Sequence, residues 1–481
     1  MSKNRIDLCW PRLGVRIGTS CARGAQFNER FPKESLKPMF PLFLFWLAAV
    51  FAIAFPVFAA PQDPIDQEPI DIVVDVDIDA QPIEGETAAV IGPDVIVGSL
   101  YQVASYGSSG GISAFAIGTY SCNIGDEWLN WFPNNNQHPV IAQNMFRLKS
   151  GRFEQIGQSW LKHGFYALSS TLCNTNCQAT DGTHLGVNCS DPYSASLNGT
   201  QGPLGPKWQV DADTGVFPYP PSNPPYSGIL ARRLQVRNSD FDPSQNGGGQ
   251  YYIESQYVSS DDAAWGNQNN NASYRVVTVE TDGVSWFIDL AGTTQRTLPA
   301  IRAWNDSDVT VRETDLQIDA EGLFILAAKV NDQGSGWWHY EYAVQNLNSH
   351  RSAKSFSIPF DPTGTVANIG FHDVDYHSGE PFSGLDWTAT VSNGVITWAT
   401  QDFSVNPNAN ALRWGTLYNF RFDINRQPQT TTATLGLFRP GVPSEVAGST
   451  LGPILSPADC NGNGVPDSID IADGSSMDCD Q

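Results

Sequence analysis

The chain has 481 residues, of which 41% are hydrophobic and 16% are charged, and its formal net charge is −23 at pH 7. This length exceeds the size at which one hydrophobic core stops growing, so we expect two or more packed units. The acidic excess repels phosphate backbones and argues against a nucleic-acid partner. The low charged fraction, with many glycine and proline residues, favours β-sheet and turns over helix.

The N-terminal 59 residues predict an export signal with an N-terminal extension. An uncharged apolar run covers 39–60, follows Lys33 and Lys37, and contains the small-x-small pattern Val57-Phe58-Ala59. The alternative is an uncleaved membrane anchor, because about 20 apolar residues can span a bilayer. No other segment is long and apolar enough to do so. The protein is therefore expected to be a secreted or cell-surface bacterial protein.

An acidic, proline-containing segment without aromatic residues covers 60–91 and is typical of a solvated linker. We expect a first β-rich module over 92–226, which ends in the proline-rich stretch 217–226. Within it, two apolar runs, 140–148 and 153–160, flank a glycine-containing turn and predict a hairpin.

Eight cysteines occur in the chain, and six of them follow the export signal. An even number in an exported protein predicts disulfides. Sequence distance suggests that Cys460 pairs with Cys479, and that the other four pair among themselves: Cys122, Cys173, Cys177 and Cys189. The alternative is a zinc site formed by thiolates of the first module, which an oxidising compartment disfavours.

A second module, a β-sandwich over 227–440, is indicated by period-2 alternation. Trp338, Tyr340 and Tyr342 fall on one face of a predicted strand, and this face is apolar. Further short strands are predicted at 274–279, 286–290, 323–330, 395–399, 417–422 and 432–438. The fold class is therefore mostly β, with two antiparallel sandwich or jelly-roll-like modules, a linker at 441–456 and a tail at 457–481.

The tail contains a twelve-residue sequence with the spacing of a calcium loop. Calcium takes six to eight oxygen ligands, which such a loop supplies from positions 1, 3, 5, 7, 9 and 12, with glycine at position 6. Gly464 stands at that sixth position. The expected calcium ligands are Asp459, Asn461, Asn463, Val465 through its carbonyl, Asp467 and Asp470.

Residues 459–470 resemble the calcium loops of bacterial dockerin type I modules, and 464–467 resemble thrombospondin type 3 repeats. Only Asp478 and Asp480 remain of a second loop, and Asp470 is shorter than the glutamate that closes a helical EF-hand. The resemblance therefore implies calcium binding in the weak extracellular range of about 10⁻⁴–10⁻³ M, without implying a cohesin partner. Through 138–144, 157–165 and 408–415, the body resembles secreted bacterial proteins of uncharacterised activity with similar tails.

The densest cluster of histidine and carboxylate side chains is at His372, Asp373, Asp375 and His377. On a strand, the last three would share one face and could bind zinc, manganese or a second calcium. The alternative is a polar strand end that leads into a turn. A second possible cluster combines three histidines of the first module: His138, His163 and His184.

Other chemistry is less defined by the sequence, and no catalytic residue is assigned. Carboxylates suited to glycoside hydrolysis are too numerous to choose among: Asp126, Glu127, Glu154, Asp261, Asp262 and Glu341. Trp337, Trp338 and Trp414 could stack on sugars. The leading hypothesis is a calcium-binding, non-enzymatic β protein of structural or adhesive type, with a polysaccharide or cell-surface partner. The alternatives are a carbohydrate-active or carbohydrate-binding protein and a metal-dependent hydrolase.

Overall fold

The computed structural model describes residues 90–222 and 224–454, all of which belong to one compact unit. The fold is mostly β, with 47% strand and 7% helix, and its sheets are antiparallel. The expected fold class is confirmed. Among the described residues, no helix is both long and apolar enough to span a membrane.

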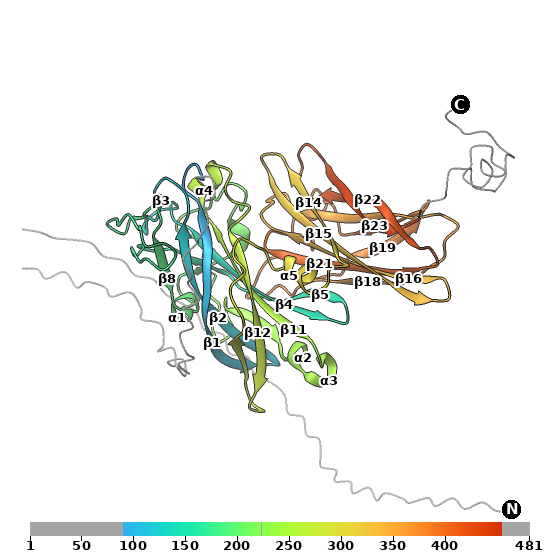
Figure 1. Ribbon diagram of the computed structural model, residues 1–481, viewed down its shortest axis with the longest axis horizontal. Helices are drawn as coiled ribbons and strands as arrows, with labels where there is room; N and C mark the ends of the chain where they lie inside the picture. The colour runs from blue at the N-terminus through green and yellow to red at the C-terminus, as the bar shows by residue number, and fades with distance from the viewer. Residues whose placement is uncertain (1–89, 223, 455–481) are drawn as a thin grey trace, which may run out of the picture. The chain divides into compact units, whose positions relative to one another are not determined.

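The first sheet has eleven strands, and its main order is β1-β2-β10-β5-β4-β11-β12-β13 (Figure 1). β1 at one end of this order also lies against β12 and β13 at the other end, so the sheet closes around a buried core. The strands are β1 (Val95–Ser109), β2 (Ile112–Asn123), β4 (Val140–Lys149), β5 (Arg152–Gln158), β6 (Leu161–His163), β8 (Ser190–Tyr193), β9 (Leu204–Gly205), β10 (Leu234–Arg237), β11 (Gln250–Val258), β12 (Ala272–Thr281) and β13 (Trp286–Leu290).

Short elements connect these strands. A two-stranded sheet pairs β3 (Leu129–Asn130) with β7 (His184–Leu185). The short helices are α1 (Ala195–Asn198), the 3₁₀ turn η1 (Lys207–Gln209), α2 (Asn238–Phe241), α3 (Pro243–Asn246), α4 (Ser260–Ala264) and α5 (Arg302–Ser307).

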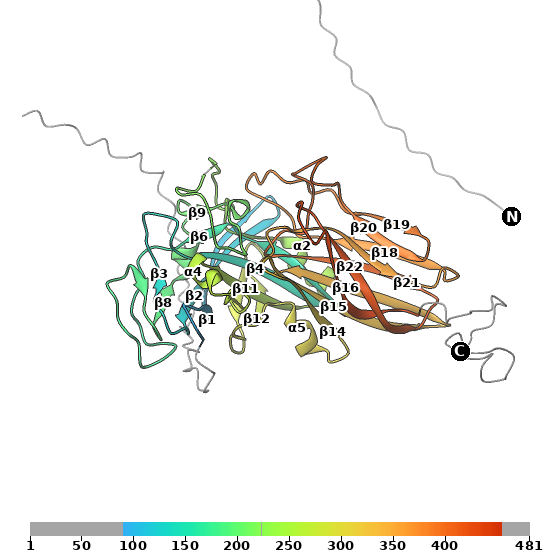
Figure 2. The ribbon, with the colours of Figure 1, turned by 90° about the horizontal axis from the view of Figure 1, so that it is seen from above.

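Two five-stranded sheets form a sandwich from the C-terminal part of the described chain (Figure 2). Their apolar inner faces share one core. In order, the first has β14 (Arg312–Ile318), β15 (Gly322–Gly334), β16 (Trp337–Asn346), β21 (Thr416–Ile424) and β18 (Val366–His372). The second has β19 (Thr388–Ser392), β20 (Val395–Ala399), β17 (Ala353–Pro359), β22 (Pro428–Leu437) and β23 (Glu445–Pro453).

The sheet that contains β15 and β16 is buried on both faces. Tyr340 and Tyr342 of β16 point into the sandwich core, as the alternation predicted. Ala343 points the other way and packs with Phe146 and Phe153 of the first sheet. This is why β15 reads as a continuous apolar run over 323–328 rather than as an alternating strand.

Two expectations about the course of the chain need correction. Residues 234–290 pair within the first sheet, because β11 pairs with β4 and β10 with β2 and β5, so the change of sheet falls after Leu290 rather than near 226. The expected linker at 441–456 contains β23, which pairs with β22 along its whole length. β23 was predicted as a linker because it is rich in small residues and glycine. Its pairing with β22 nevertheless satisfies its backbone hydrogen-bonding groups.

Candidate functional site

The loop that follows β18 borders a hollow of about 200 Å³, which we call the outer hollow. Three carboxylate side chains line it, from Asp373, Asp375 and Glu380, together with the rings of Tyr376 and Phe382. A cavity of this size can hold a small ring, since an engineered cavity of about 150 Å³ binds benzene. The hollow is therefore the best candidate for a ligand site in the part of the chain that the structure describes.

A tight turn holds this loop against the first sheet. The backbone N–H of His377 donates to Glu380 Oε2 at 2.9 Å, and His377 Nε2 donates to the carbonyl of Gln158 at 2.7 Å. Burial lowers the pKa of His377 to about 4, so its ring is neutral at physiological pH. Gly379 has φ of +70°, and a Cβ there would overlap the hydroxyl of Tyr226. The turn is thus held by hydrogen bonds of His377 and by the close approach of Tyr226 to Gly379.

A smaller cavity of about 20 Å³ adjoins the outer hollow, and we call it the inner chamber. It is large enough for about one water molecule, which needs roughly 10–15 Å³. Tyr376, Glu380 and Phe382 line both cavities, so these three side chains border the two spaces. The remaining charged or titratable side chains that line the inner chamber are basic: Lys207, His350, Arg413 and Arg439.

Lys207 lies at the start of η1 and is only 4% exposed. Its Nζ donates to Gln158 Oε1 at 3.1 Å and to the Gly415 carbonyl at 3.4 Å. Burial lowers the pKa of Lys207 to about 8, and burial raises the pKa of Glu380 to about 7. Both groups therefore titrate close to physiological pH, which is unusual for either residue type.

Arg413 closes another side of the inner chamber and is 8% exposed. Its guanidinium lies over the Phe382 ring at 3.5 Å, and Nη2 donates to the carbonyls of Pro407 and Ala409. The buried Nε has no hydrogen-bond partner among the described residues. The site therefore contains a buried cation whose donors are only partly used.

The four residues of the sequence-predicted metal cluster have separate partners. β18 ends at His372, so 373–377 lack the strand geometry on which the shared face depended. His372 contacts the Gln155 carbonyl, Asp373 accepts from Asn410, and Asp375 pairs with Arg237. Burial raises the pKa of Asp373 to about 6. Within the described ranges, no group of three or more His, Cys, Asp or Glu side chains is placed to hold a metal ion.

Two of the three histidines of the first module meet. His138 Nε2 and His163 Nδ1 lie 3.0 Å apart, and His138 Nδ1 donates to the Phe132 carbonyl. Burial lowers the pKa of His138, and burial together with the neighbouring His138 lowers that of His163 to about 3. His184 instead packs its ring on Phe132. The pair is a neutral, hydrogen-bonded part of the core.

The carboxylates considered for glycoside hydrolysis are dispersed. Asp262 is buried and accepts from the Val95 N–H, whereas Asp261 accepts from that of Asn130. Glu154 and Glu341 form ion pairs with Arg152. Asp126 accepts from the Gly92 N–H, and Glu127 is exposed. None of these six lines the outer hollow.

The tryptophans considered as sugar platforms differ in exposure. Trp337 and Trp338 are half-buried at the start of β16, and Trp338 packs against the sandwich core. Trp414 is buried, and its Nε1 donates to the Val210 carbonyl. Trp414 lines the inner chamber, and Trp337 and Trp338 line neither this chamber nor the outer hollow.

The four cysteines of the first sheet pair among themselves, as expected. Cys122 is bonded to Cys173, and Cys177 to Cys189. The pairing excludes free thiolates at these positions as zinc ligands. The other predicted features fall outside the described residues: the export signal, Cys460, Cys479 and the calcium loop from Asp459 to Asp470.

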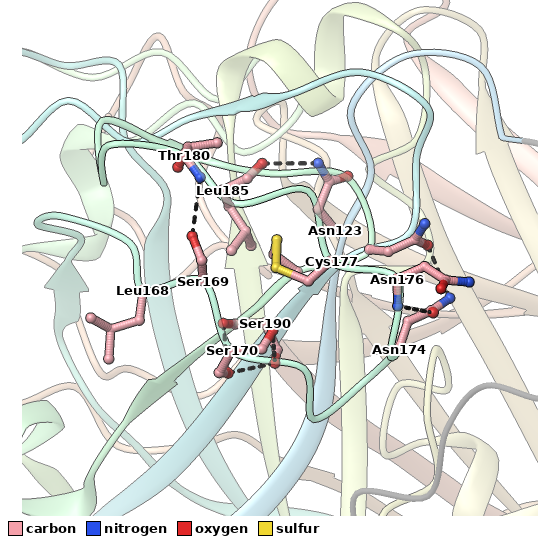
Figure 3. Close-up of a disulfide and its surroundings, with 12 residues drawn as sticks. Asn123, Leu168, Ser169, Ser170, Asn174, Asn176, Cys177, Thr180, Leu185 and Ser190 are labelled. Carbon is pink, nitrogen blue, oxygen red and sulfur yellow. Dashed lines mark hydrogen bonds between the residues drawn. A yellow bond between two sulfur atoms is a disulfide. The ribbon is translucent and has the colours of Figure 1, made fainter.

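Hydrogen bonds fix the loop around the second of these disulfides (Figure 3). Ser170 Oγ donates to the Ser190 carbonyl at 2.8 Å, and the Thr180 N–H donates to Ser169 Oγ. The Asn176 N–H donates to the side chain of Asn174. A loop with little regular structure is thereby held in one conformation.

Sequence reasoning missed the basic residues of the inner chamber. Lys207, Arg413 and Arg439 come from three separate segments, and none belongs to a local cluster of polar side chains. Glu380, three residues after His377, was not among the predicted site residues. The one usable signal was the presence of lysine and arginine within apolar segments, as in Pro206-Lys207-Trp208 and Leu412-Arg413-Trp414.

No family model matches the chain, and no curated protein matches it. Among solved structures, it is similar to a serine-rich repeat adhesion glycoprotein from Streptococcus agalactiae, with a TM-score of 0.19 and 6% identity over 70% of this chain and 89% of that one. The N-terminal domain of a Streptococcus gordonii adhesin gives a TM-score of 0.17 and 9% identity over 76% of this chain and 97% of that one. At these scores neither likeness defines a shared fold, and neither supports a function.

Proposed function

We propose that this chain is an exported β protein that binds carbohydrate at the outer hollow and serves an adhesive or structural role outside the cell. Its polysaccharide or cell-surface partner would be recognised by the loop 373–384. The two disulfides support an extracellular location, because such bonds persist in oxidising compartments. Contact with a membrane is proposed only through the export signal.

The observation that carries this proposal is the mixed lining of the outer hollow. A sugar ring has apolar C–H faces and polar hydroxyl edges, so its site needs aromatic rings beside fixed polar groups. Tyr376 and Phe382 provide the rings, and Asp373, Asp375 and Glu380 provide acceptors for hydroxyl groups. Partners elsewhere hold several of these groups in place, among them Asn410 for Asp373 and Arg237 for Asp375.

A second candidate function, glycoside hydrolysis, is favoured by the same carboxylates. Such enzymes need one carboxyl group that stays protonated near neutral pH and a second that is ionised. Burial raises the pKa of Asp373 to about 6 and that of Glu380 to about 7, and both line the outer hollow. Glu380 would be the acid, with Asp373 or Asp375 as the ionised partner.

The test is a glycan-array screen of the secreted protein with and without EDTA. Phe382→Ala removes a ring from the hollow, whereas Phe165→Ala removes a partly exposed ring that lines neither cavity. We expect specific glycans to bind to the wild type and to Phe165→Ala, and to bind at least about tenfold more weakly to Phe382→Ala. A blank array, or equal binding by both variants, would show that the hollow is not a glycan site.

The same array glycans separate binding from hydrolysis. If any bound glycan is cleaved on incubation, and Glu380→Gln abolishes the cleavage without abolishing binding, the second candidate function replaces the first. Intact glycans after prolonged incubation leave the adhesive role in place.

The calcium loop at 459–470 is part of the proposal and rests on its sequence pattern. Its ligand types and spacing match those of a twelve-residue calcium loop. We assign it a stabilising role, because binding of a metal ion to a folded loop adds its binding free energy to the stability of that loop.

A further inference from the structure

Basic side chains outnumber acidic ones in the lining of the inner chamber. Lys207, Arg413 and Arg439 line it together with His350, and Glu380 is the only acidic side chain among the described lining residues. Buried charges are costly unless they are paired. No described carboxylate forms an ion pair with any of the three cations.

The partners that these cations have are neutral. Lys207 donates to an amide oxygen and a carbonyl, and Arg413 donates to two carbonyls. Arg413 lies more than nine-tenths buried, and its buried Nε–H has no described partner. Burial and then the charge of Arg413 lower the pKa of Arg439, which shows that the cations repel one another. An anion in the chamber would relieve this repulsion and use the spare donors.

The size and position of the chamber limit what that anion can be. A space of about 20 Å³ accepts one or two atoms and no sugar ring. It shares Tyr376, Glu380 and Phe382 with the outer hollow, which has room for a ring. A ligand in the outer hollow would therefore reach the chamber with at most two atoms of an anionic group, such as the two oxygens of a carboxylate.

We infer that the inner chamber takes the carboxylate of an acidic sugar whose ring occupies the outer hollow, with Lys207 and Arg413 as its charged partners. This inference rests on the proposed carbohydrate function and specifies the class of glycan. Arginine is suited to this task because its planar fork can donate two parallel hydrogen bonds to one carboxylate. Glu380, which is protonated in part near neutral pH, offers the ligand a hydroxyl donor as well as an acceptor.

The test compares two monosaccharides, galacturonate and galactose, which differ only by a carboxylate or a hydroxymethyl group at C6. Their dissociation constants are measured by titration calorimetry on the full-length protein at pH 7. We expect galacturonate to bind at least about tenfold more tightly, a difference of about 1.4 kcal/mol. Equal affinities for the two sugars, or binding of neither, would overturn the inference.

Two variants connect the preference to the chamber. Lys207→Met removes the charge and keeps the volume, so we expect the affinity ratio to fall towards one. Lys162→Met is the matched control, because Lys162 is also buried, at 3% exposure, and lines neither cavity. Arg413→Lys, which keeps the charge but not the fork, should retain part of the preference. A urea denaturation curve of Lys207→Met itself shows whether that variant is folded.

An undiminished preference in Lys207→Met would also overturn the inference. The proposed function fails separately, because the glycan array decides whether any sugar, neutral or acidic, depends on Phe382. A protein that binds only neutral glycans at the hollow would therefore keep the proposed function and lose this inference.

Discussion

Asp191 in β8 is a buried carboxyl group with an incomplete set of partners. It is 1% exposed, its Oδ1 accepts from the Leu168 N–H at 2.8 Å, and its Oδ2 has no described partner. Burial raises its pKa to about 8. In the unfolded chain the carboxyl group of Asp191 titrates near pH 4. Between about pH 4 and 8 this carboxyl group is therefore protonated in the folded state and ionised in the unfolded state. Folding stability therefore falls as the pH rises through this window.

Asp191→Asn should raise the free energy of unfolding by about 1–3 kcal/mol at pH 8, because a neutral amide replaces a carboxylate in an apolar site. The gain should vanish below about pH 3, where the aspartate is protonated in both the folded and the unfolded state. Urea denaturation at the two pH values checks this. A variant that is destabilised more at the higher pH than at the lower one would show that the carboxylate, not the acid, is the favoured form.

Single residues show what local sequence can and cannot predict. For Asp373 the alternative to a metal ligand, a polar strand end that leads into a turn, agrees with the end of β18 at His372 and the turn at Ser378 and Gly379. Lys207 and Arg413 were not recognised, because 206 positions separate them and only the tertiary fold brings them to one chamber. The His138–His163 contact likewise depends on strand pairing that no spacing rule encodes.

At the scale of elements, the disulfides secure a part of the first sheet with little regular structure. Cys122 of β2 is joined to Cys173 over 51 residues, whereas Cys177 and Cys189 close a segment of 12. A cross-link restricts the unfolded chain more when it closes a longer loop. The two bonds should therefore differ in their contribution to stability.

Replacing both Cys122 and Cys173 by alanine should cost about 4 kcal/mol, and replacing both Cys177 and Cys189 about 3 kcal/mol. Guanidinium denaturation of the oxidised variants gives both values. Both pairs are also packed in apolar clusters, the first with Ile96 and the second in the larger core of the first sheet, so loop length alone sets the expected order. The reverse order would mean that native packing of the loop outweighs chain entropy.

Strands were predicted from sequence more successfully than their partners. The hairpin of β4 and β5 and all six short strands of 274–438 are present, because alternation and turn residues are local signals. The assignment of β11 to β13 to the first sheet was missed, since antiparallel partners can lie anywhere along the chain. β23 was missed because Gly448 and Gly452 weaken its strand pattern; both lie against side chains where a Cβ would clash.

For the whole molecule, calcium binding by the predicted loop at 459–470 can be tested directly. Calcium titration of the full-length protein should give a binding heat with a dissociation constant of about 10⁻⁴–10⁻³ M, and Asp459→Ala should remove most of it. Asp319→Ala, which alters an exposed carboxylate of the body, is the control. Equal heats in the two variants would assign any calcium binding to a place other than the 459–470 loop.

The sheet of β14, β15, β16, β21 and β18 belongs to two cores, since one of its faces packs in the sandwich and the other against Phe146, Phe153 and Tyr252. Glu254 ties the same junction together by accepting from Asn144, Ala300 and Gln345. Neither part can be cut away without leaving an apolar face bare. In evolution this body therefore has to be inherited and duplicated as one piece, unlike proteins assembled by shuffling of independent modules.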